Sequence, residues 1–113
     1  MIDKTKKIIK IGDLISYLKL EPKDFQNGVY VDHGNDILEY KGFHENGNLW
    51  EHCWYKNGKL NGEYKLFHKN GNLLEHCWYK NGERDGEYRW FRENGNLLEH
   101  CWYKNGIIVK KIL

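Results

Sequence analysis

The sequence contains three histidine–cysteine pairs, and both residue types can bind a metal ion. They are His52-Cys53, His76-Cys77 and His100-Cys101. Neighbouring residues of a β-strand point to opposite faces of a sheet, and equivalent positions on every second strand lie about 9.5 Å apart. This spacing fits neither a tetrahedral zinc site nor a disulfide. We therefore expect three free thiols and no bound metal or other cofactor.

Two further residue types recur with these pairs and could take part in chemistry. Glu51, Glu75 and Glu99 are spaced like the cysteines, and paired carboxylates can hydrolyse glycosidic bonds. Each glutamate has the same sequence surroundings, however, so none has the distinct environment that a catalytic acid or base needs. We expect solvated surface glutamates, no small-molecule substrate and no enzymatic activity. The tryptophans could stack on sugar rings or bases, pack across strands or form a contact platform; they are Trp54, Trp78 and Trp102.

All of these residues belong to one block that is written three times, at residues 46–58, 70–82 and 94–106. The repeat has a fixed period of 24 residues, which indicates a repeat architecture. Asn-Gly pairs begin at positions 46, 57, 70, 81, 94 and 105, and such pairs between strand-forming residues predict type I′ hairpin turns. The predicted fold is therefore all-β, an elongated and twisted antiparallel β-meander that forms a single-layer array of hairpins.

The turns also predict how the strands pair. Each unit contains two strands, which are residues 62–69 and 72–80 in the second copy. Two-residue turns leave one possible register between consecutive strands. The expected pairs include Tyr64 with Cys77, Phe67 with Leu74, Tyr79 with Arg84, and Cys77 with Gly86.

Strand alternation distributes apolar side chains over both faces of this sheet, whereas a half-solvated sheet should be apolar on one face only. Either a bulge near Gly62 and Gly86 rotates some residues, or the second face is covered. One face would carry the leucines at 49, 73 and 97, the cysteines, and the tyrosines at 40, 64, 88, 55, 79 and 103. The other would carry Phe43, Phe67, Phe91, the three tryptophans, the three histidines, Trp50, Leu74 and Leu98.

The period defines the domain organisation. We expect a repeat domain over residues 26–113 and a non-repeat N-terminal cap over residues 1–25. In the cap, residues 6–11 could form a strand, and residues 13–20 could form a helix that begins at Asp13. The segment Ile107–Leu113 replaces a polar strand by an apolar capping strand, and an exposed apolar edge strand pairs readily with another chain.

Composition excludes several other classes of protein. The chain has 113 residues and a formal net charge of +2, without the strong basic patch expected of a nucleic-acid-binding protein. No apolar run approaches the roughly 20 residues of a membrane span. The N-terminal residues lack the apolar core and cleavage site of a signal peptide. We therefore expect a cytoplasmic protein that does not bind nucleic acid.

The repeat unit resembles the MORN repeat, in the variant form found in bacterial antitoxin-component-like proteins and in giant DNA viruses. The resemblance covers about residues 28–113. It implies elongated, twisted, single-layer arrays of hairpins that act as scaffolds, dimerising modules or lipid-proximal modules, and a viral origin would place the protein in host cytoplasm or a virion. The matching residues in the second copy are Gly62, Tyr64, Phe67, Asn70-Gly71, Leu73, Tyr79 and Asn81-Gly82.

These observations predict a non-enzymatic scaffold that contacts a protein partner or itself as a homodimer. One alternative is peripheral contact with anionic lipid or a phosphoinositide, since Lys4, Lys6, Lys7 and Lys10 form a basic cluster. Carbohydrate binding through the tryptophans and an antitoxin-like role remain further alternatives. The predicted interaction face consists of Phe43, Trp50, Trp54, Phe67, Trp78, Phe91, Trp102, Ile107 and Val109.

Overall fold

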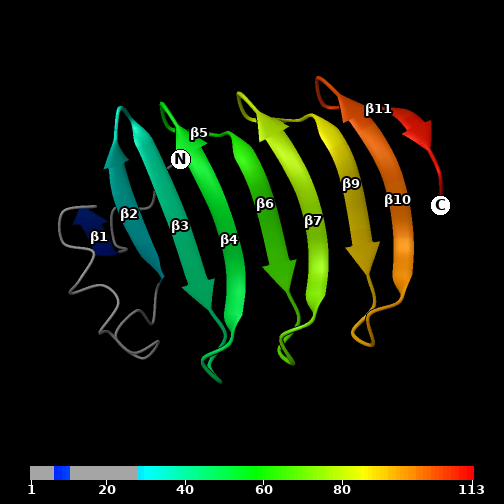
Figure 1. Ribbon diagram of the computed structural model, residues 1–113, viewed down its shortest axis with the longest axis horizontal. Coiled ribbons are helices and arrows are strands. Elements are labelled where there is room, and N and C mark those ends of the chain that lie inside the picture. The colour runs from blue at the N-terminus through cyan, green and yellow to red at the C-terminus, as the bar shows by residue number, and fades with distance from the viewer. Residues whose placement is uncertain (1–6, 11–27) are drawn as a thin grey trace.

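The protein forms one open β-sheet in a computed structural model that describes residues 28–113 and the backbone of residues 7–10. Its strands follow one another across the sheet in the order β1-β2-β3-β4-β6-β7-β9-β10-β11, with short β5 beside β4 and short β8 beside β7 (Figure 1). The strands are β1 (Lys7–Lys10), β2 (Val29–Gly34), β3 (Ile37–Phe43), β4 (Leu49–Lys56), β5 (Lys59–Leu60), β6 (Gly62–Phe67), β7 (Leu73–Lys80), β8 (Glu83–Arg84), β9 (Gly86–Phe91), β10 (Leu97–Lys104) and β11 (Ile107–Lys111).

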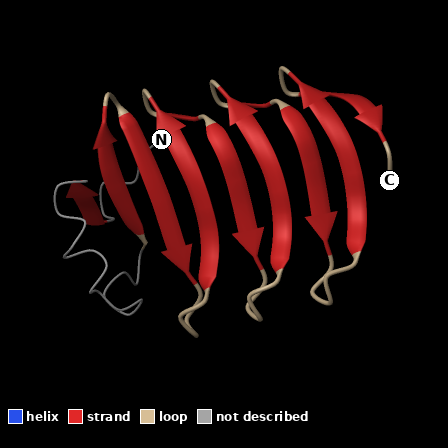
Figure 2. Cartoon of the chain, in the orientation of Figure 1, coloured by secondary structure: helices blue, strands red, loops and turns tan. Residues whose placement is uncertain are grey.

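The predicted all-β, single-layer array is confirmed. Figure 2 shows strands joined by loops along two opposite rims of the sheet, and the described residues contain no helix. It follows that this part of the chain has no helix able to span a membrane. The helix proposed at residues 13–20 lies outside the described residues.

The first strand departs from the predicted antiparallel meander. A strand is present at Lys7–Lys10, as the sequence suggested, but it pairs with β2 in parallel, with Lys7 opposite Val29. Two parallel strands cannot be joined by a tight hairpin and need a longer crossover connection. The repeat pattern could not predict this pairing, because β1 lies outside the repeats.

Two kinds of turn alternate along the array. At Asn57, Asn81 and Asn105 the asparagine has a φ of 50°, 51° and 51°, and the following glycine has a φ of 77°, 85° and 81°. Positive φ at both central residues is the requirement of the type I′ turn, so these turns are confirmed.

The turns at Asn46, Asn70 and Asn94 are different, and here the predicted type I′ conformation is wrong. Of each Asn-Gly pair, only the glycine has positive φ, and the backbone N–H of Gly71 donates to the carbonyl of His68 at 2.9 Å. This pattern is that of a type I turn followed by a left-handed glycine. The extra residue shifts the pairing, so that Phe67 lies opposite Leu73 rather than Leu74.

Asparagine side chains tie these three-residue loops to one another. The Asn72 backbone N–H donates to Asn70 Oδ1 at 2.9 Å, and both side-chain amides donate to the carbonyl of Glu93 in the next loop, at 3.1 Å and 2.9 Å. Asn46 and Asn48 donate in the same way to the carbonyl of Lys69. One carbonyl oxygen has two lone pairs and can accept both bonds. The loops therefore stack along one rim of the sheet.

One of the two alternatives was a bulge near Gly62 and Gly86 that rotates some residues; the structure contains the bulge but not the rotation. Both glycines have a φ of 110°. Tyr55 lies opposite Leu60 before the bulge, and Glu51 lies opposite Leu66 after it, so the register advances by two residues. The predicted pairing of Cys77 with Gly86 is therefore wrong, since β7 and β9 pair through Glu75 with Trp90 and His76 with Arg89. A shift of two residues leaves every side chain on its original face.

Within the repeats the apolar core lies on one face of this sheet, which we call the tyrosine–cysteine face. Val29 and Val31 of β2 are also buried, and because they alternate with Tyr30 they belong to the opposite face. One buried cluster contains Tyr30, Tyr40 and Cys53, and a second contains Cys77, Tyr88 and Cys101. Tyr64 packs against both clusters and joins them. The opposite face carries Trp54, Trp78 and Trp102 and is called the tryptophan face.

Replacing Gly86 by alanine tests the bulge. Residues with a Cβ rarely adopt a φ of 110°, and such strain costs about 1–3 kcal/mol. The nearest atom to an added Cβ is Trp78 Cβ at 3.6 Å, so the cost comes from backbone conformation rather than a clash. Urea unfolding should show Gly86→Ala destabilised by that amount. Lys80→Ala at an exposed strand position is the control, and equal stability of the two variants would contradict the bulge.

Candidate interaction surfaces

Histidine–glutamate hydrogen bonds join neighbouring strands on the tryptophan face. His52 Nε2 lies 2.6 Å from Glu39 Oε2, His76 Nε2 lies 2.9 Å from Glu63 Oε2, and His100 Nε2 lies 2.9 Å from Glu87 Oε2. A carboxylate accepts only, so each Nε2 donates. The histidines therefore hold adjacent strands together through Nε2, one of the two ring nitrogens that can bind a metal ion.

The environment of His76 also shows which ring nitrogen carries the proton. Arg89 Nη2 lies 2.8 Å from His76 Nδ1, and a guanidinium can only donate. Nδ1 must then accept, which leaves the proton on Nε2 facing Glu63. Among the described residues, no group of three or more histidine, cysteine or acidic side chains is placed to hold a metal ion.

Glu39 receives two of these bonds. His33 Nε2 lies 3.0 Å from Oε1 and His52 Nε2 lies 2.6 Å from Oε2. The hydrogen bond from His52, helped by His33 and Lys41, lowers the pKa of Glu39 to about 2, although burial acts in the opposite direction. The ring of Trp54 lies 5.1 Å from that of His33 and 6.0 Å from that of His52, and so packs beside this cluster.

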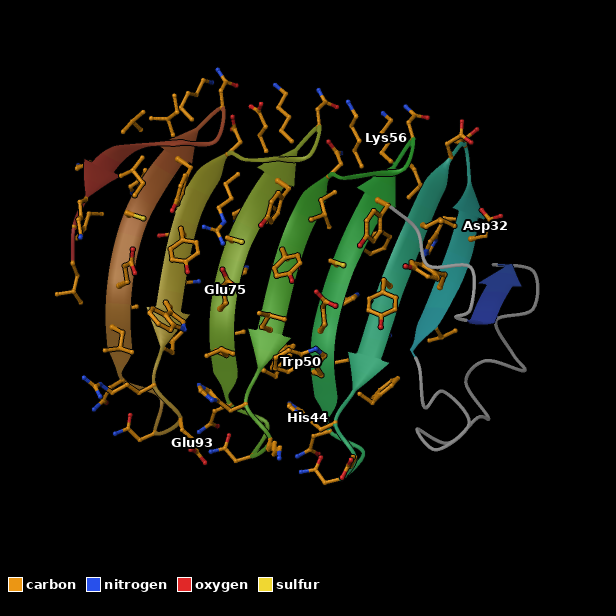
Figure 3. All side chains as sticks on the ribbon, turned by 180° about the vertical axis from the view of Figure 1, so that it is seen from behind. Asp32, His44, Trp50, Lys56, Glu75 and Glu93 are labelled. Atoms are coloured by element: carbon orange, nitrogen blue, oxygen red, sulfur yellow. The ribbon has the colours of Figure 1, made fainter. Side chains whose placement is uncertain are left out.

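The nine residues of the predicted interaction face differ in how exposed they are. Trp50, Trp78 and Trp102 are 40 %, 41 % and 40 % exposed, whereas Trp54 and the three phenylalanines are partly buried. Trp50 lies near the rim, with its ring 5.0 Å from that of His44 (Figure 3). The aromatic residues are spread from β3 to β10, and Ile107 and Val109 lie on β11. Their role in binding remains a prediction.

Among the side chains of residues 28–113, the most exposed apolar surface is that of the edge strand β11. Ile107 is 69 % exposed and Val109 is 63 % exposed, and Ile108, Ile112 and Leu113 are also exposed. The predicted interaction face included Ile107 and Val109 alone from this strand. The whole of β11 is exposed instead, and the apolar run from Ile107 to Leu113 was the signal for the residues that this prediction missed.

The glutamates on the tyrosine–cysteine face are not all solvated, contrary to the sequence-based expectation. Glu75 is only 9 % exposed and lies midway along the sheet (Figure 3). Its Oε1 accepts a hydrogen bond from Arg84 Nη2 at 3.2 Å. One repeat earlier, Glu51 accepts a hydrogen bond from the hydroxyl of Tyr64. These partners satisfy carboxylates that the tyrosine packing partly removes from water.

The three cysteines are free and buried, as expected from their spacing. Burial, together with the neighbouring Glu75, raises the pKa of the Cys77 thiol to about 12. The thiolate is the nucleophilic form of cysteine. At neutral pH this thiol therefore behaves as a small apolar side chain of the core.

The hydrogen bonds from His33 and His52 to Glu39 predict that the folded state loses stability at low pH. A carboxyl whose pKa is about 2 in the folded state and 4.5 in the reference state stabilises the fold above pH 4.5, and this contribution is lost as the pH falls toward 2. Glu39→Gln should therefore lower the free energy of unfolding by about 1–3 kcal/mol at pH 7 and flatten its decline between pH 5 and 2. Urea unfolding at several pH values measures both effects, with Glu45→Gln in an exposed loop as the control. Unchanged acid dependence in Glu39→Gln would contradict the assignment.

Comparison with known proteins agrees with the repeat geometry. The chain matches the family described as MORN repeat variant at residues 38–57, 60–81 and 84–105. No curated protein and no solved structure matches the chain. The three matched segments are consecutive copies of the strand–turn–strand unit and together cover more than half of the sequence. The chain therefore belongs to the MORN repeat variant family, whose members are generally interaction modules without catalytic activity.

Proposed function

We propose that this protein is a non-enzymatic scaffold that self-associates through the edge strand β11. The observation that carries the proposal is the exposure of apolar side chains along the whole strand, with Ile107 at 69 % and Val109 at 63 %. Edge strands also present unpaired backbone N–H and C=O groups. Such an edge is suited to adding another strand.

A second copy of the chain is the proposed occupant of this edge. Twofold symmetric dimers use the same surface on both subunits, so β11 would pair antiparallel with β11 of the second copy. Pairing centred on Val109 sets Lys111 of one copy opposite Ile107 of the other. The like charges of Lys110 and Lys111 are thereby kept apart, and apolar residues meet near the axis.

Sedimentation velocity over a dilution series tests the dimer. The unmodified chain should show a concentration-dependent monomer–dimer equilibrium, and Val109→Lys should weaken association at least about tenfold, because a charge on an edge strand opposes pairing. Leu97→Lys makes a similar change at an exposed site on β10 and should leave association intact. A monomer at every concentration, or equal association of both variants, would overturn the proposal.

Contact with anionic lipid is the second candidate function. It is supported by three exposed lysines at or beside the apolar edge strand, Lys104, Lys110 and Lys111, and by the general association of MORN repeats with membranes. Electrostatic binding of this kind should require anionic lipid and weaken as salt is added. The basic cluster at Lys4, Lys6, Lys7 and Lys10 lies outside the residues whose side chains are described.

Vesicle flotation tests the lipid contact. The protein should float with vesicles that contain phosphatidylserine and should not float with phosphatidylcholine vesicles, and added salt should release it. Replacing both Lys110 and Lys111 by glutamine should reduce flotation, whereas Lys69→Gln together with Lys80→Gln provides a control of equal charge change. Flotation that depends neither on the charge of the lipid nor on the salt concentration would exclude this function.

A further inference from the structure

Arg84 occupies a well-formed guanidinium site on the tyrosine–cysteine face. Its Nη2 donates to Glu75 Oε1 at 3.2 Å, its Nε donates to the hydroxyl of Tyr79 at 3.3 Å, and its Nη1 donates to the hydroxyl of Tyr103 at 3.3 Å. The guanidinium carbon lies 4.8 Å from the ring centre of Tyr88 and 5.4 Å from that of Tyr103. Hydrogen bonds to a carboxylate and contacts with aromatic rings both favour a guanidinium.

The site around Glu75 recurs once in each repeat, and the repeats differ in which residue, if any, bonds to the glutamate. The glutamates of the series are Glu51, Glu75 and Glu99, each one repeat apart. Glu51 accepts a bond from Tyr64, and Glu75 accepts one from Arg84. The position of Arg84 is taken by Leu60 in the preceding repeat and by Ile108 in the following one.

Within residues 28–113, Glu99 is bonded neither to a tyrosine hydroxyl nor to an arginine. Ile108 takes the sequence position of Arg84, and Ile112 takes that of Tyr88, although β11 pairs with β10 in a register of its own. Lys111 lies opposite Cys101 on the neighbouring strand, but within the described residues no ion pair or hydrogen bond to the Glu99 carboxylate is formed. Glu99 is partly exposed, so a group from outside the chain can reach it.

Tyr103 provides a second acceptor beside Glu99. It is the equivalent of Tyr79, which accepts the Nε of Arg84. A phenolic oxygen can accept more than one hydrogen bond, and the oxygen of Tyr103 receives one, from Arg84 Nη1. The terminal repeat therefore retains two of the acceptors that hold Arg84, the carboxylate and the hydroxyl, but lacks the arginine.

We propose that Glu99 and Tyr103 form a binding site for an arginine side chain of a partner protein. The partner supplies in trans the guanidinium that Arg84 supplies within the chain. In the terminal repeat β11 already occupies the strand position beside β10, with Ile108 opposite Tyr103, so the arginine of the partner approaches from the open tyrosine–cysteine face. The site lies on β10 and is independent of self-association through β11.

Titration of the full chain with a short capped peptide, Val-Arg-Val, tests the site by NMR. We expect saturable shifts of the Glu99 side-chain carboxyl carbon and the Tyr103 ring signals. The same peptide with neutral citrulline in place of arginine should give none. Capped arginine alone should bind at the same residues.

Two variants complete the test. Glu99→Gln should weaken peptide binding at least about tenfold, since a hydrogen bond to a charged group is lost, whereas Glu93→Gln in an exposed loop should have no effect. Ile108→Arg restores the internal cation and should abolish peptide binding and raise the unfolding temperature, while Ile108→Met should do neither. Equal binding of the arginine and citrulline peptides, or full binding to Glu99→Gln or Ile108→Arg, would overturn the proposal.

Discussion

Packing of tyrosine rings over cysteines on one face of a single sheet is the interaction on which the rest of this structure depends. Over residues 28–113 the sheet has no second layer, so it has to build its core from its own side chains. The small thiols of Cys53, Cys77 and Cys101 are almost completely buried, because tyrosines on the adjacent strands lie against them. Tyrosine suits this role because its ring is apolar and its hydroxyl can meet water or a polar partner.

That core requires polar groups to be satisfied close to it. Burial raises the pKa of Tyr64, and its hydrogen bond to Glu51 raises it further, so its hydroxyl stays protonated and donates to that carboxylate. Burial likewise raises the pKa of Tyr88, with Glu75 adding to the effect, and Arg84 balances the carboxylate of Glu75. Glu75 is thus part of the core, which explains why the expectation of a solvated glutamate failed there.

The sequence allowed the sheet, its period and half of its turns to be predicted, and the reason is local. At Asn57, Asn81 and Asn105 the chain meets the steric demand of a type I′ turn within two residues. At Asn46, Asn70 and Asn94 the same dipeptide adopts another turn, in which asparagine side chains bond to the next loop. That choice depends on contacts 21 to 23 residues away in sequence, which no local rule contains.

The surfaces were harder to predict than the fold, because the exposure of a group depends on the few positions at which the repeats differ. Trp78 and Trp102 are 41 % and 40 % exposed. Leu60, Arg84 and Ile108 occupy one repeat position with three different side chains. In a repeat array each unit has nearly the same backbone, so a single substitution decides whether a polar group is satisfied by a tyrosine, by an internal arginine or by neither. The repeats therefore differ in what they can bind because of the positions at which their sequences differ, and not because of the block that all three share.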